Sequence, residues 1–80
     1  MEELEKKTIE IKEKYADVIN DLATKYEKDV GVGFDMLIAI ARAKFNNLDP
    51  EYTTDIEFDE AELQKDYEEY LTLAEAKKLL

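Results

Sequence analysis

The side chains of this chain that could do chemistry are chiefly carboxylates. The 80-residue sequence holds 21 Asp and Glu against 11 Lys and Arg, and its formal net charge is −10. Ten of the acids fall within residues 49 to 69 beside a single base, Lys65, so this segment carries most of the net charge. These acids are Asp49, Glu51, Asp55, Glu57, Asp59, Glu60, Glu62, Asp66, Glu68 and Glu69. Any function of the segment must use concentrated negative charge.

Carboxylates at alternate positions are typical of a calcium-binding loop, and Asp55, Glu57 and Asp59 have that spacing. The sixth position of such a loop needs glycine for a sharp turn, and the twelfth needs a bidentate glutamate. Glu60 and Asp66 stand at these two positions. We therefore expect no metal site. Carboxylate pairs for glycoside hydrolysis can be chosen from 21 acids in many ways, and no spacing selects one pair.

Four residue types are absent from the chain: Cys, His, Ser and Trp. Without Ser or Cys the common nucleophiles are missing. Without His there is no side chain that ordinarily titrates near neutral pH. We therefore expect a binding protein and not an enzyme, with no catalytic residues and no cofactor. The negative charge also repels nucleic acid and anionic membranes, so we expect no direct binding to either.

Two aromatic residues, Tyr52 and Phe58, are interleaved with the acids. Aromatic side chains anchor protein contacts and charges steer partners together. We expect the segment to dock on a basic surface of another protein, such as a nucleic-acid-binding protein. The expected partner-binding residues are Asp49, Glu51, Tyr52, Asp55, Glu57, Phe58, Asp59, Glu62, Asp66 and Glu69. The alternative interpretation is a solvated face that keeps a small protein soluble.

In size and charge the chain resembles the small acidic inhibitors that phages direct against host defence or transcription proteins. The resemblance lies in composition and not in motifs, and it implies a mimic of nucleic acid that occupies the binding groove of its target. B-DNA carries about nine charges over ~15 Å of its axis. Residues 60 to 69 hold five acids and one base over the same length of helix. One copy therefore reaches about half the charge density of DNA, and two copies side by side come closer.

A long helix over residues 2 to 30 is predicted to begin the chain, because apolar residues recur there every three or four positions. Gly31 and Gly33 are expected to end this helix. An alternative is that the helix bends or splits near residues 17 to 20.

Residues 34 to 45 are predicted to form a second helix, which is apolar on two sides and should therefore be central. Asn46-Asn47 should end it. An alternative is that residues 30 to 34 form a short strand beside residues 55 to 58. In the loop that follows, residues 50 to 54 are expected to form one helical turn and residues 55 to 58 an extended segment.

A third helix is predicted from residue 60 to about residue 79, with Asp59 as its cap and Glu62 three residues further on. Its expected apolar face comprises Leu63, Tyr67, Tyr70, Leu71 and Ala74. Glu62, Asp66 and Glu69 should line the face away from this apolar stripe.

These elements predict an all-α fold: a single domain over residues 1 to 80, arranged as a small three-helix bundle. Helices of about 43, 18 and 30 Å do not match in length, so the short second helix cannot cover the first. We therefore expect two copies to associate as a homodimer. The expected interface residues are Phe34, Met36, Ile40 and Phe45. The alternative function is accordingly an assembly protein that oligomerises through the apolar faces of its first two helices.

The sequence contains no run of apolar residues long enough to span a membrane. Its first residues are charged throughout, unlike a secretory signal. The absence of cysteine fits a reducing compartment. We therefore expect a cytoplasmic protein.

Overall fold

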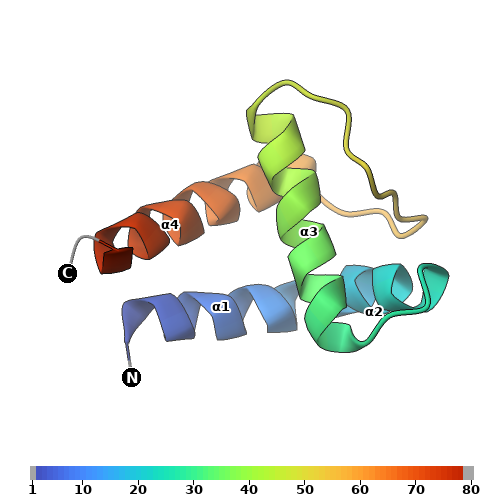
Figure 1. The fold of residues 1–80 in the computed structure, drawn as a ribbon, viewed down its shortest axis with the longest axis horizontal. Helices are drawn as coiled ribbons and strands as arrows, with labels where there is room; N and C mark the ends of the chain where they lie inside the picture. The colour runs from blue at the N-terminus through green and yellow to red at the C-terminus, as the bar shows by residue number, and fades with distance from the viewer. Residues whose placement is uncertain (1, 79–80) are drawn as a thin grey trace.

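The computed structural model describes residues 2 to 78, and within them the regular elements are four helices. They are α1 (Glu3–Lys14), α2 (Ala16–Lys25), α3 (Val30–Phe45) and α4 (Glu60–Lys78). α1 and α2 follow one another, α4 runs antiparallel beside α1, and α3 crosses from α2 to the beginning of α4 (Figure 1). The predicted all-α fold is confirmed, but four helices replace the expected three. No strand occurs in this part of the chain.

The expected long first helix is wrong, because the chain leaves helical geometry at Tyr15. Tyr15 has φ −113° and ψ 27°, and its side chain is buried. Its hydroxyl donates a hydrogen bond to Asp66, and its ring packs edge-on against Phe58. These contacts hold the residue between two helices. The alternative prediction, a split near residues 17 to 20, is close to the observed break. The break lets α1 pack on α4 while α2 packs on α3.

The glycines that were expected to end the first helix lie inside α3 instead. α2 ends earlier, where Glu27 adopts a left-handed φ of 54° and the amide of Lys28 donates to the carbonyl of Ala23. α3 then begins at Val30, because the Asp29 carboxylate caps it by accepting from the Val32 amide at 2.9 Å. The strand proposed for residues 30 to 34 is therefore also wrong.

Gly33 has a packing role. A Cβ atom placed there would lie 2.6 Å from the carbonyl oxygen of Ile19 in α2, which is too close for any side chain. The missing side chain lets α3 approach the backbone of α2 directly.

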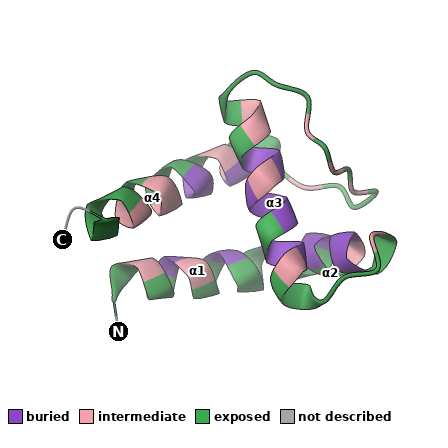
Figure 2. Cartoon of the chain, in the orientation of Figure 1, coloured by how far each residue is buried: buried purple, intermediate pink, exposed green. Residues whose placement is uncertain are grey.

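α3 holds more buried residues than any other helix and packs against α2 and α4 (Figure 2). The predicted central position does not distinguish it, because each of the four helices makes its main contacts with two others. The side chains with almost no exposed surface come from all four helices: Ile11, Ile19, Leu22, Leu37 and Leu63. Three of the four residues expected at an interface between copies, Phe34, Met36 and Ile40, also lie in this core. Only Phe45 is exposed, by 45%. The break at Tyr15 thus allows one chain to cover its own apolar surface.

α3 ends at Asn46-Asn47 as expected, with Asn47 in a left-handed conformation at φ 58°. The following residues 46 to 59 form an irregular loop, so the helical turn expected at residues 50 to 54 is wrong. Residues 55 to 58 bend at their beginning and are not a strand. No helix within residues 2 to 78 is long and apolar enough to cross a membrane.

α4 begins at Glu60 as predicted, and the Asp59 carboxylate accepts from the amide of Glu62 at 3.1 Å. Leu63 and Tyr67 are buried on its apolar face, with Tyr70 and Leu71 partly buried. The helix continues through Lys78, and its predicted last residue lies outside the described range.

Candidate functional site

The structure divides the acidic segment into two parts with different surroundings. Acids on α4 face lysines of α1, whereas acids in the loop of residues 46 to 59 face solvent. We call this loop the acidic loop. It holds five acids and no base.

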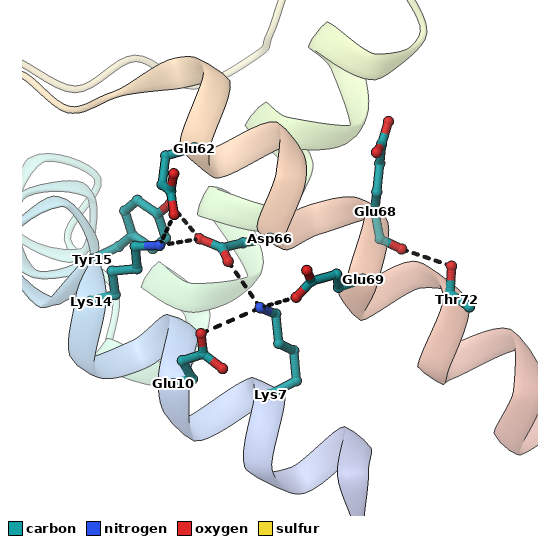
Figure 3. A network of polar contacts seen from close by, with 9 residues as sticks. All are labelled: Lys7, Glu10, Lys14, Tyr15, Glu62, Asp66, Glu68, Glu69 and Thr72. Carbon is teal, nitrogen blue, oxygen red and sulfur yellow. Dashed lines mark hydrogen bonds and ion pairs between the residues drawn. The ribbon is translucent and has the colours of Figure 1, made fainter.

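Asp66 of α4 lies in the interior, with only 4% of its surface exposed. One carboxylate oxygen accepts from Lys7 at 2.9 Å. The other accepts from Lys14 at 3.0 Å and from the Tyr15 hydroxyl at 2.6 Å. Figure 3 shows these donors converging on Asp66 from α1 and the break that follows it. The expectation that Asp66 faces away from the apolar stripe is therefore wrong.

The neighbouring acids extend this contact along α4. Glu69 accepts from Lys7 at 2.5 Å, and Glu62 pairs with Lys14 (Figure 3). Near the chain ends, Lys77 and Glu2 form a further ion pair at 3.1 Å. We call Lys7, Lys14, Tyr15, Glu62, Asp66 and Glu69 the α1–α4 polar cluster. Each of the three α4 acids that were expected to bind a partner is therefore paired with a lysine of α1, and the two lysines offset most of their charge.

The three buried members of the cluster, Asp66, Lys7 and Tyr15, have pKa values shifted away from neutral pH. Burial favours the neutral form of Asp66, but hydrogen bonds from Tyr15 and the two lysines outweigh it and lower the pKa of Asp66. Burial acts against the charged form of Lys7, but hydrogen bonds to Glu69 and Asp66 outweigh it and raise the pKa of Lys7. Burial and the bond to Asp66 raise the pKa of Tyr15. A proton-transfer catalyst needs a pKa near the working pH, so this cluster is structural in character.

The spacing of two lysines in α1 is a sequence signal for the cluster. Lys7, Ile11 and Lys14 are spaced by four and three residues, so they share one helical face. Ile11 is completely buried on that face. Two lysines beside a core residue require acidic partners on the helix packed against them. Which acids these are depends on how α4 docks.

The acidic loop is fastened near its middle to α2. The Thr53 amide donates to the Tyr26 hydroxyl at 3.0 Å, and Lys25 donates to the Thr53 hydroxyl at 2.9 Å. The Thr54 hydroxyl donates to Asp21 at 2.6 Å, and this bond lowers the pKa of Asp21. These α2 residues were not predicted, because their partners are about 30 residues away and leave no local pattern.

The two aromatic residues expected to anchor a partner instead anchor the loop. The ring of Tyr52 packs edge-on against Tyr26 with 5.2 Å between centroids. The ring of Phe58 packs edge-on against Tyr15 at 6.4 Å. Both are partly buried against the core. Together with the hydrogen bonds to α2, they give the loop a defined conformation.

Four loop acids remain open to solvent: Asp49, Glu51, Asp55 and Glu57. None of them forms an ion pair with a base in the described part of the chain. The fifth, Asp59, is exposed but occupied as the cap of α4, and Glu60 pairs with Lys44 at 2.7 Å. The candidate site is therefore these four carboxylates with the exposed apolar side chains Leu48 and Ile56 beside them.

No three carboxylates in residues 2 to 78 approach one another closely enough to hold a metal ion. Comparisons with protein-family models, with curated proteins and with solved structures found no match to this chain. The function must therefore be argued from the geometry of the chain itself.

Proposed function

We propose that this protein is a binding module that docks on a basic surface of another protein through its acidic loop. The observation that carries the proposal is that four exposed carboxylates lie on one loop without a base to neutralise them. A field of one sign attracts an oppositely charged surface and accelerates its approach. The acids of α4 contribute less, because lysines of α1 already pair with three of them.

The attachment of the loop to α2 supports the same proposal. A loop that is ordered before binding loses less conformational entropy when a partner arrives. Thr53 and Thr54 fix the centre of the loop, while the acids lie on either side of this attachment. The loop thus presents its charges from a defined backbone.

Mimicry of nucleic acid is a narrower form of this proposal, and only the exposed acids of the acidic loop support it. Four of the five acids in residues 60 to 69 pair with lysines, which leaves no DNA-like row of charges along α4. The assembly alternative relied on Phe34, Met36, Ile40 and Phe45, of which only Phe45 is exposed. We do not propose it.

The test compares two variants with equal changes of charge in affinity capture from cells of the source organism. The loop-neutral variant carries Asp49→Asn, Glu51→Gln, Asp55→Asn and Glu57→Gln. The control variant carries Glu5→Gln, Glu13→Gln, Asp35→Asn and Glu75→Gln, which are exposed acids elsewhere on the surface.

Wild type and the control variant should retain the same basic protein at low salt and lose it as salt rises, because exposed charges are screened. The loop-neutral variant should retain little of it at any salt concentration. Equal capture by both variants would show that the loop is not the docking site. Circular dichroism of each variant should remain helical, which separates lost binding from lost folding.

A further inference from the structure

Beside the acidic loop lies a shallow hollow of about 300 Å³ between α3 and the beginning of the loop. Its apolar lining comes from Ala39 and Ala43 of α3 and from Leu48 after the helix, and Asn46 also lines it. Arg42, Asp49 and Glu51 stand around it. The two alanines lie four residues apart on one helical face, so their small side chains leave the space open.

Leu48 is presented to solvent by a rigid backbone. It is 64% exposed, more than any other large apolar residue in the described part of the chain. Its amide donates to the carbonyl of Ala43 at 2.8 Å, and Asn47 before it has a left-handed φ of 58°. This arrangement closes the end of α3 and fixes the direction of the chain. The exposed leucine is therefore a stable feature of the surface, and covering it by a partner would be favourable.

The charge around the hollow selects the kind of partner. Asp49 and Glu51 form no ion pair with a base within residues 2 to 78, and Arg42, which also lines the hollow, supplies one positive charge. The rim is thus net negative and complements Lys or Arg on a partner. A second copy is a poor occupant, because each copy carries −10. The volume also lies at the lower limit for small-molecule pockets, which favours one or two protein side chains.

We propose that this hollow receives a short segment of the partner protein, with one large aliphatic side chain flanked by Lys or Arg. The aliphatic group packs on Ala39, Ala43 and Leu48, and the flanking cations pair with Asp49 and Glu51. The inference rests on the proposed function, since it names the part of the acidic loop that recognises the partner. It adds that apolar contact, as well as charge, determines which basic proteins bind.

The experiment titrates the isotope-labelled full chain with a short synthetic peptide and records amide chemical shifts. The probe peptide has blocked ends and a leucine between lysines. One control peptide replaces the leucine by alanine, and another replaces the lysines by glutamates. Four protein variants are compared with wild type: Leu48→Ser, Ala39→Gln, which fills the hollow without changing charge, the loop-neutral variant, and Ile9→Ser as a control. Ile9 is exposed by 43% on α1, away from the loop.

The probe should shift the amides of residues 39 to 51 and bind at least about tenfold more weakly to Leu48→Ser and Ala39→Gln, as expected for loss of one buried aliphatic contact. Ile9→Ser should bind as wild type does. The alanine peptide should bind wild type about tenfold more weakly than the probe does, and the glutamate peptide should not bind.

If the probe binds the loop-neutral variant more weakly but binds Leu48→Ser as tightly as wild type, the hollow is not the binding site, although docking by charge would still hold. If the glutamate peptide binds as tightly as the lysine peptide, the acids around the hollow do not select a positively charged partner. Absence of any shift in residues 39 to 51 would also overturn the inference. The affinity-capture experiment tests the proposed function separately, because it measures how neutralising the whole acidic loop affects binding of natural partners.

Discussion

The ammonium group of Lys7 lies 2.9 Å from the carboxylate of Asp66, although 59 residues separate the two in the sequence. Both side chains are almost completely buried, and together they join α1 to α4. A buried ion pair costs desolvation energy, and the hydrogen bonds from Lys14 and Tyr15 to Asp66 offset part of that cost. The stability of the α1–α4 contact should therefore depend strongly on whether each charge keeps its partner.

Replacing Asp66 by alanine should lower the free energy of unfolding by about 3 kcal/mol, because buried Lys7 and Tyr15 lose an acceptor. The double variant Lys7→Met with Asp66→Leu should recover at least half of that loss, since it removes both buried charges. Urea unfolding followed by circular dichroism measures both. Lys77→Ala, which breaks the exposed pair with Glu2, is the control and should cost less than about 1 kcal/mol. A double variant no more stable than Asp66→Ala would contradict this account.

The same carboxylate makes a pH-dependent contribution to stability. The pKa of Asp66 is lowered in the folded protein, so on acidification the unfolded chain takes up the proton first, near its ordinary pKa of about 3.9. The contribution should be complete above about pH 5 and should be lost as pH falls through the folded-state pKa. The stability difference between wild type and Asp66→Asn should therefore shrink below about pH 4. Protonation of the other carboxylates lowers the net negative charge of both proteins equally. A stability difference that stays constant as pH falls would therefore show that Asp66 does not cause the pH dependence.

Alanine at Gly33 should be destabilising by about 1–3 kcal/mol, because the new Cβ would meet the Ile19 carbonyl at 2.6 Å and push α3 away from α2. Gly31→Ala is the matched control within the same helix turn. Its Cβ would lie 3.3 Å from Oδ1 of Asp29, the atom that caps α3, so this carboxylate must shift by a few tenths of an ångström and a smaller loss of stability is expected. Thermal unfolding should rank Gly33→Ala clearly below Gly31→Ala. Equal melting temperatures would mean that α2 and α3 do not approach as closely as described.

Asp21→Ala should loosen the acidic loop without unfolding the helices, because it removes the acceptor for the Thr54 hydroxyl and the Asp55 amide. Hydrogen exchange of the Asp55 amide should accelerate, while amides in α3 keep their protection. Asp21→Asn retains an oxygen acceptor and serves as the control, with a smaller acceleration expected. If all amides accelerate together in Asp21→Ala, the residue supports the whole fold and not the loop alone.

Local patterns in the sequence were sufficient for much of the helical architecture. The periodicity of residues 60 to 78 and the Asp59 cap predicted α4 within the described range, and the apolar composition of residues 34 to 45 predicted a helix rich in buried residues. The concentration of acids around the loop was also evident before folding. These features depend on neighbours within a few positions, which is why sequence spacing reveals them.

Tertiary contacts decided the rest. The break at Tyr15 follows from contacts with Asp66 and Phe58, and Gly33 lies inside a helix because α2 passes beside it. The packing of α1 on α4 likewise divided the acids into a group paired with lysines on α4 and an exposed group on the loop. Spacing alone describes one helix at a time. Which lysine meets which carboxylate is determined only when α1 and α4 pack together, and that packing left four exposed carboxylates of the acidic loop without an ion pair in the described part of the chain.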